Sequence, residues 1–298
     1  MLQAAISRLF IDSMKEQNFI KIINDITQSP FLGDDCAYLK DYGLVTTQDN
    51  FIEDVHFKRE WATPFQIGYK ATVVNISDIL AAGAIPKYLT VGLSLPNDID
   101  DEFIKEFYLG VKAGSYGAEI IGGDITGADK IFVSITALGS DKERKISSRR
   151  NAKVGYKIIT SGKYGLSTLG LNELMNGGNN QELIKAHLEP SLNVKFSKAI
   201  SAQIETDYAM MDTSDGLADA LYKIAESSGV KITAKNIDGM YCAEDYNLVA
   251  AVPSEFLSKI SDYEIIGEVK KFDGYYLEIG NKKYINYNQL GTYNHFGE

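Results

Sequence analysis

Cysteines are scarce in this sequence, and basic residues are fewer than acidic ones. Its 298 residues include two cysteines, Cys36 and Cys242, which show no metal-ligand spacing and offer at most one disulfide. Such sparse cysteine usage predicts a reducing cytoplasm in which both thiols are free. Acidic residues outnumber basic ones by 40 to 30, which gives a net charge of -10. Because a nucleic-acid surface needs clustered Lys and Arg, the acidic balance predicts that the chain binds no nucleic acid.

Long apolar runs are also missing. The first ten residues lack a charged segment followed by an apolar one, so no signal peptide is expected. The longest apolar stretch, residues 71–85, is interrupted by Asn75, Ser77 and Asp78 and cannot span a bilayer. We therefore expect a cytoplasmic protein with no membrane partner.

The common nucleotide-binding motifs are absent from the sequence. The segment nearest to G-x-x-x-x-G-K-[ST] is Ser161-Gly162-Lys163, but Lys157 stands where the first glycine belongs and Tyr164 replaces the hydroxyl residue. Neither a G-x-G-x-x-G motif nor a kinase catalytic loop occurs. A nucleotide would therefore be bound by another architecture.

Helix and strand patterns alternate along the chain. Apolar residues recur at helical spacing in residues 2–14, 65–82, 103–117, 166–175, 194–203 and 217–225. Short apolar runs predict strands at residues 36–39, 43–47, 88–95, 120–123, 131–138, 156–160 and 231–234, and another ending at Asp212. Between residues 139 and 153 the composition changes to Lys, Arg, Ser and Glu, which is typical of a domain junction. These patterns predict an α/β or α+β fold with two domains, residues 1–140 and 141–298.

Aspartates gather at the ends of the predicted elements. They are Asp35, Asp49, Asp78, Asp124, Asp212 and Asp215. Each alone is typical of a turn or cap residue, but Asp78 lies inside an apolar helical pattern, where an unpaired carboxylate needs a cation or a strong donor. Before Asp124, Gly122 and Gly123 would allow the backbone to approach a phosphate closely. Because carboxylate and hydroxyl oxygens are the ligands that Mg²⁺ takes, the pattern predicts a metal and phosphate site.

Five segments, in order and spacing, resemble the thiamine-monophosphate kinase family, in the superfamily that includes aminoimidazole ribonucleotide synthetase. They are GDDCAYL, TTQDNFIEDVHF, GYKATVVNISDILAAGAIPKYLTVGLSLP, IIGGDITG and MDTSDGLADALYKIAESSGV. The resemblance runs from Gly33 to Val230 and more faintly to the C-terminus. It implies an N-terminal domain (1–140) that binds ATP and magnesium and contributes strands to the β-barrel of a homodimer. It also implies a C-terminal α/β domain (141–298), with ATP between the two.

The resemblance also implies roles for individual residues. Several Mg²⁺ ions would be bound by Asp35, Thr47, Gln48, Asp49, Asp78, Asp124, Asp212 and Asp215, of which Asp78, Asp124, Asp212 and Asp215 would be catalytic. ATP would contact Gly123, Asp124, Arg149 and Ser214. Thiamine phosphate would face His56, Glu244 and Tyr293.

Taken alone, three of these residues have simpler interpretations. His56 between two apolar residues is typical of a packed side chain, Arg149 lies in a basic run that could be a solvated linker, and Tyr293 could be a packed tail aromatic. The chain also departs from the family pattern. Gln48 stands where the family has a threonine or a similar residue, residues 231–243 are a shortened segment, and Cys242-Ala243 replaces a Gly-Gly pair.

The implied reaction moves the γ-phosphoryl group of ATP onto the phosphate of thiamine monophosphate, which gives thiamine diphosphate. A phosphate monoester has a second pKa of about 6, so the acceptor is already mostly ionised at neutral pH. No general base is then required, which suits a chain with three histidines. The reaction depends instead on positioning and on neutralising two anions that approach each other.

Other readings remain open at this point. A selenophosphate synthetase would have a reactive cysteine before the first aspartate pair, whereas Cys36 follows it. A hydrogenase-maturation relative would end in a cysteine, whereas this chain ends at Glu298. Another ATP-dependent synthetase of the superfamily, such as a ligase, is an alternative. So is a noncatalytic nucleotide or metal binder, which the shortened segment before Glu244 favours.

Overall fold

A computed structural model describes residues 18–291 of the chain. Its first sheet contains β1 (Ala37–Leu39), β2 (Leu44–Ile52), β3 (Ile85–Leu95), β4 (Glu119–Gly127) and β5 (Phe132–Ser140), in the spatial order β1-β2-β5-β3-β4. Neighbouring strands are antiparallel except for the parallel pair β3 and β4. Residues 18–27 are helical, but the helix predicted over residues 2–14 lies outside the described residues.

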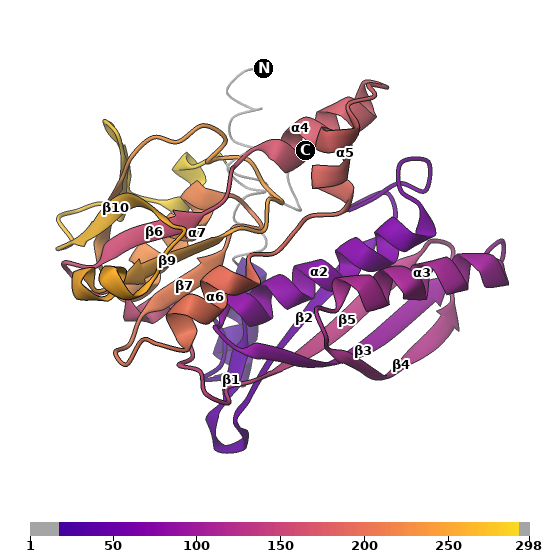
Figure 1. Ribbon diagram of the computed structural model, residues 1–298, viewed down its shortest axis with the longest axis horizontal. Coiled ribbons are helices and arrows are strands. Elements are labelled where there is room, and N and C mark those ends of the chain that lie inside the picture. The colour runs from indigo at the N-terminus through magenta and orange to yellow at the C-terminus, as the bar shows by residue number, and fades with distance from the viewer. Residues whose placement is uncertain (1–17, 292–298) are drawn as a thin grey trace.

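The second sheet is built from the rest of the chain (Figure 1). Its strands are β6 (Lys157–Ser161), β7 (Ala209–Asp212), β8 (Lys231–Ala234), β9 (Leu248–Val252), β10 (Glu264–Lys270), β11 (Leu277–Ile279) and β12 (Lys282–Tyr284). Their spatial order is β12-β11-β8-β10-β6-β9-β7. The accompanying helices are α4 (Leu166–Met175), α5 (Gln181–Leu188), α6 (Val194–Ser201) and α7 (Leu217–Ser228). The predicted mixed α/β class is confirmed.

Helix α2 (Pro64–Ala81) is the central helix of the molecule. Thr63 and Gln66 form a capping box at its start, with Pro64 at the first helical position, and the left-handed Gly83 (φ +80°) follows its end. Most of its residues are buried, because α3 (Asp101–Gly114), the first sheet and the C-terminal half all pack against it (Figure 1). A Cβ atom at Gly68 would lie 2.1 Å from the Phe107 carbonyl oxygen, so glycine lets α2 and α3 approach closely.

The hydrophobic core is continuous between the two halves of the chain. Ile76 and Ile79 of α2 belong to the same buried cluster as Ile135 of β5, Ile200 of α6 and Ala250 of β9. This packing fixes α2 against the second sheet, so polar groups near the end of α2 are held beside those at the end of β7. No helix among residues 18–291 is long and apolar enough to cross a membrane.

Candidate active site

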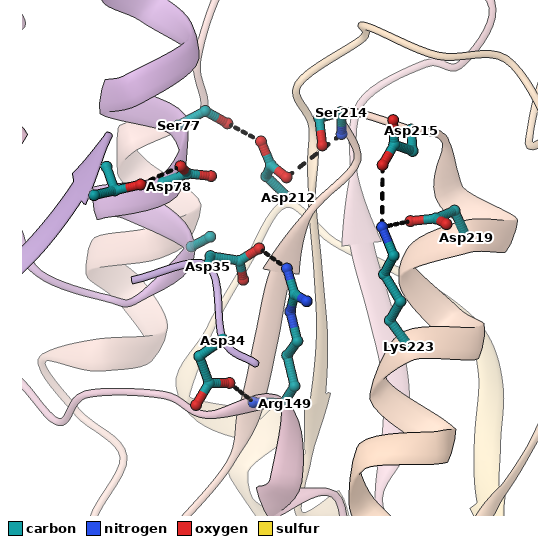
Figure 2. A network of polar contacts seen from close by, with 12 residues as sticks. Asp34, Asp35, Ser77, Asp78, Arg149, Asp212, Ser214, Asp215, Asp219 and Lys223 are labelled. Carbon is teal, nitrogen blue, oxygen red and sulfur yellow. Dashed lines mark hydrogen bonds and ion pairs between the residues drawn. The ribbon is translucent and has the colours of Figure 1, made fainter. Parts of the chain in front are cut away.

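Three aspartates from distant parts of the chain converge at the end of α2. Asp35 lies just before β1, Asp78 lies in the last turn of α2, and Asp212 is the last residue of β7. One carboxylate oxygen of each lies within 4.8 Å of those of the other two, and Figure 2 shows the side chains turned toward a common space. The convergence that the predicted site requires is therefore present in the fold.

Hydroxyl groups orient two of these carboxylates. Thr47 Oγ1 donates a hydrogen bond of 2.7 Å to Asp78 Oδ2, and Ser77 Oγ donates one of 2.7 Å to Asp212 Oδ2. Asp35 is instead ion-paired with the Arg149 guanidinium. Each carboxylate is thus oriented by at least one group of the protein.

The aspartates raise one another's pKa values. Burial raises the pKa of Asp78 well above its usual range, and the carboxylates of Asp49 and Asp212 raise it further. Burial, with the Asp35 carboxylate, raises the pKa of Asp212 to about 7. Buried carboxylates this close repel one another, and a cation between them relieves that repulsion. An all-oxygen donor set of this spacing fits a hard divalent cation such as Mg²⁺.

Strand β2 sends its neighbouring polar side chains to opposite faces of the first sheet. Thr47 contacts Asp78, and the Asp49 carboxylate lies close enough to raise the pKa of Asp78. The side chain between them, Gln48, bonds instead to Ser134 at 3.2 Å and to Thr136 at 3.1 Å on the other face. Because side chains alternate along a strand, Thr47 and Asp49 lie on the face of β2 that is near the three aspartates, whereas Gln48 lies on the opposite face.

Asp124 lies at the opposite edge of the sheet from the cluster. It is exposed on β4, and three strand spacings, about 14 Å in total, separate β4 from β2. A Cβ atom at Gly123 would lie 2.0 Å from the Val91 carbonyl oxygen, so strand packing explains this glycine, whereas Gly122 faces open space. Within one chain, neither Gly123 nor Asp124 reaches the three clustered aspartates.

Arg149 is positioned by the aspartate pair of the GDD segment. Asp34 accepts hydrogen bonds from Arg149 N at 2.7 Å and from Ser148 Oγ at 2.8 Å, while Asp35 pairs with the guanidinium. Burial lowers the pKa of Arg149, but the Asp35 carboxylate outweighs this effect and the net shift is upward. No described residue accepts a hydrogen bond from Arg149 Nε. Arg149 is therefore a fixed cation beside the cluster and retains a donor.

Ser214 and Asp215 follow β7 in the turn that leads into α7. Ser214 N lies 3.4 Å from Asp212 Oδ1, which joins this turn to the cluster. The Asp215 carboxylate is bound by Lys223 Nζ at 3.0 Å. Asp215 therefore already has a cation from within the chain.

A cavity of about 520 Å³ opens beside Asp35 and Ser148, but Asp78 and Asp212 do not line it.

Glu244 lies where the two halves of the chain meet. Its Oε1 is 3.1 Å from Lys70 Nζ of α2, and its Oε2 is 3.6 Å from His187 Nδ1 of α5. Its backbone is left-handed (φ +64°), a conformation that is uncommon for residues other than glycine and that often occurs at functional sites. Burial raises the pKa of Glu244, but Lys70 and His187 outweigh this effect and the net shift is downward.

The other two residues predicted to face thiamine phosphate are His56 and Tyr293. His56 Nδ1 accepts a hydrogen bond of 3.0 Å from Ile52 N, and the ring stacks on Phe51 with centroids 5.4 Å apart. His56 is one of the groups near enough to Glu244 to influence its pKa, so the two side chains lie in the same part of the molecule. Tyr293 lies outside the described residues.

Sequence reasoning missed the basic partners of this site. Lys70 is only 2% exposed, although it lies in a helix whose apolar pattern was recognised. A lysine inside such a pattern is itself a signal, because a buried ammonium requires an anionic partner. Lys223 carried a second signal, since it follows Asp219 by four residues on the predicted helix.

Comparisons with known proteins identify the family of the chain. The family model for the N-terminal domain of AIR synthase related proteins matches residues 33–140. The thiamine-monophosphate kinase of Aquifex aeolicus (strain VF5) is 32% identical over an alignment that covers 90% of this chain and 95% of the relative.

Solved structures are similar over nearly the whole chain. The structure of AaThiL complexed with AMPPCP and TMP has a TM-score of 0.85 at 29% identity and covers 95% of this chain and 97% of that one. The hydrogenase maturation protein HypE of E. coli shares the fold alone, with a TM-score of 0.62 at 19% identity over 90% of this chain and 95% of that one. The sequence identity and coverage of the Aquifex relative show that the chain belongs to the thiamine-monophosphate kinase family.

Proposed function

We propose that this protein transfers the γ-phosphoryl group of ATP to thiamine monophosphate and so forms thiamine diphosphate in the cytoplasm. The observation that carries the proposal is the convergence of Asp35, Asp78 and Asp212 in a chain of this family. A similar structure was solved with AMPPCP and TMP bound, which supports ATP and thiamine monophosphate as the two substrates.

Asp35, Asp78 and Asp212 would hold magnesium, with Thr47 and Asp49 of β2 beside them. When bound, Mg²⁺ would offset the charge of these carboxylates and of the phosphates, so that two anions can approach. The protein keeps the carboxylates fixed through the Thr47 and Ser77 hydroxyls, which limits reorganisation during the transfer.

Arg149 would contact the phosphates of ATP. Its guanidinium is held by Asp35 and its main chain by Asp34, so its direction is set before a ligand arrives. A preorganised guanidinium is well suited to a charge-assisted contact with phosphate. Ser214, which is joined to Asp212 by its backbone N–H, would lie on the same side of the ATP.

Glu244, His56 and Tyr293 would face thiamine phosphate, and we call these three residues the substrate wall. The acceptor phosphate needs no protein base because it is mostly ionised at neutral pH. These residues would therefore serve to position the substrate, and its orientation would follow from the fixed direction of Glu244.

The working unit would be a homodimer with two domains in each chain, residues 1–140 and 141–298. Among residues 18–291, β4 pairs only with β3, and Ile121 and Ile125 of β4 are 57% and 62% exposed. The part of β2 beyond Thr46 likewise has an open edge, because β1 pairs only with Leu44–Thr46. Pairing β4 of a second copy with this edge would close a barrel and cover both strands.

The direct test is to incubate the protein with ATP, MgCl₂ and thiamine monophosphate and to measure thiamine diphosphate by thiochrome fluorescence after chromatography. The wild type should form the product. Asp78→Asn and Asp212→Asn should each lower kcat by at least about 100-fold, because the site loses a fixed charge that stabilises the transfer.

The matched control is Asp98→Asn, which changes an exposed aspartate paired with Arg59 on the surface and should leave turnover unchanged. Thermal unfolding of each variant checks that the fold persists. Wild-type protein that binds ATP without forming product would instead support a noncatalytic relative. Normal turnover by Asp78→Asn would reject the proposed site.

A further inference from the structure

Lys223 binds Asp215, a carboxylate to which the family pattern assigns a metal ion. We propose that Asp215 holds no divalent ion in this protein and that the Lys223 ammonium supplies the positive charge there instead. The inference rests on the proposed function, because it concerns which cation neutralises Asp215 in the proposed ATP-binding site.

The geometry of the ion pair separates Asp215 from the metal cluster. Lys223 lies two turns into α7 and reaches back to the start of the helix, where its Nζ is 3.0 Å from Asp215 Oδ2 and 2.8 Å from Asp219 Oδ2. Figure 2 shows Asp215 turned toward Lys223, whereas Asp212 is turned toward Ser77. Asp215 is also not in the group formed by Asp35, Asp78 and Asp212.

Asp219 fixes the ammonium in this place. Its side chain is 1% exposed, and a buried carboxylate without a cation is strongly unfavourable. The carboxylates of Asp219 and Asp215 both lie within 3.0 Å of the Lys223 Nζ, and two anions at this distance favour the charged ammonium. The ring of Tyr287 lies 5.7 Å from Nζ and adds a cation–π contact.

A divalent ion on Asp215 would therefore need one of two unfavourable changes. If Lys223 stayed, the ion would share a carboxylate with an ammonium and the two cations would repel. If Lys223 moved away, the buried Asp219 would lose its cation and keep the hydrogen bond with Tyr287. Asp78 and Asp212 differ, because their neighbours Thr47 and Ser77 are neutral hydroxyl donors and add no positive charge. Asp35 is paired with Arg149, but one of its carboxylate oxygens lies within 4.8 Å of those of Asp78 and Asp212 and would share their ion, whereas Asp215 lies outside this group.

The test counts bound cations. Mn²⁺ would be titrated by electron paramagnetic resonance into the full-length protein with AMPPCP present, for the wild type, Asp215→Asn and Asp78→Asn. Asp215→Asn leaves the pair between Lys223 and Asp219 in place and should bind as many Mn²⁺ ions per protomer as the wild type. Asp78→Asn is the positive control and should bind fewer. Loss of one Mn²⁺ ion in Asp215→Asn would overturn the inference.

A second variant tests the same point from the opposite direction. Lys223→Gln combined with Asp219→Asn removes the buried ion pair as a unit, so no buried charge is left alone, and it releases Asp215. This double variant should gain one Mn²⁺ ion per protomer, whereas Lys223→Arg should gain none. Absence of the gain in a double variant that unfolds cooperatively would count against the inference. The Mn²⁺ count does not depend on turnover, so a failure of the proposed kinase activity is seen separately in the wild-type assay.

Discussion

At the scale of single residues, Asp78 and Asp212 make the site sensitive to pH and to metal. Burial and the neighbouring carboxylates raise the pKa of both side chains, and that of Asp212 reaches about 7 from an ordinary 3.8. At a pH between the two pKa values, a carboxyl group whose pKa is higher in the folded state keeps a proton that the same group releases in the unfolded chain. Its contribution to stability is therefore present at low pH and is lost as pH rises through the folded-state pKa.

We therefore expect the metal-free protein to lose stability at Asp212 as pH rises from about 4 to about 7, by on the order of 2–4 kcal/mol. Adding Mg²⁺ should restore the loss, and should do so more at pH 7.5 than at pH 5, because ionised carboxylates bind the ion more tightly. Thermal unfolding at both pH values, with EDTA or with MgCl₂, measures the two effects.

The control for this expectation is Asp212→Asn, which removes the titrating group. Other groups also titrate in this range, so the informative quantity is the stability of the variant minus that of the wild type, both in EDTA. This difference should increase from pH 5 to pH 7.5. A constant difference would mean that the Asp212 carboxylate is not strained in the metal-free fold.

At the scale of elements, one buried network joins α2, α4, α5 and the connection between β8 and β9. Lys70 Nζ lies 3.1 Å from Glu244 Oε1 and 3.5 Å from His187 Nε2, and Ser167 Oγ lies 3.0 Å from His187 Nδ1. Glu244 N also donates to the Ser214 carbonyl oxygen at 2.7 Å. The network thus connects the proposed substrate wall to the turn that carries Ser214, and Lys70 is its central cation.

Lys70→Met should raise KM for thiamine monophosphate by about tenfold, equivalent to about 1.4 kcal/mol, and leave KM for ATP nearly unchanged. Methionine fills a similar volume but leaves the Glu244 carboxylate without its ammonium, so the carboxylate loses its fixed direction. Steady-state kinetics with each substrate varied in turn measures the two constants. Lys112→Met, on α3, serves as the control for the substitution itself. An equal rise in both constants would indicate a general structural defect rather than a role in positioning Glu244.

Helices were easier than strands to predict from this sequence. Residues 65–82 were predicted as a helix because apolar spacing, the stop at Gly83 and the later Pro86 agree, and α2 spans Pro64–Ala81. Strand β9 was missed because Leu248–Val252 is buried on both faces, so it lacks the alternation by which a half-buried strand is recognised. The tyrosine-rich tail gave no strand pattern, yet β11 and β12 pair within it.

At the scale of the whole molecule, the meeting of Asp35, Asp78 and Asp212 could not be worked out from local patterns. They belong to segments separated by 43 and 134 positions, and only the packing of α2 against both sheets brings them together. The family resemblance supplied that expectation. It did not reveal that Asp124 of the same chain lies beyond reach, because a strand's place in the sheet follows from tertiary pairing.

The open edges of β2 and β4 lead to a prediction about how two copies cooperate. If β4 of one copy pairs with β2 of the other, Asp124 is supplied to the Asp78 of the second copy and acts across the dimer. Asp124→Asn and Asp78→Asn should each be inactive alone. After the two variants are mixed and subunits exchange, half of the dimers are mixed, and each of these has one site in which both aspartates are intact. Activity should therefore recover to about a quarter of the wild-type value.

Two further measurements make the recovery decisive. Ile121→Lys with Ile125→Lys places charges on the exposed β4 edge and should shift the protein to monomers in sedimentation velocity, with loss of turnover. Mixing Asp124→Asn and Asp78→Asn in that monomeric background should restore nothing. If Asp124 instead acted within its own chain, every site in the mixture would carry one of the two substitutions and no activity would return. Absence of recovery in dimers that exchange subunits would therefore exclude the shared site. Recovery would establish that each phosphate site is built by two chains.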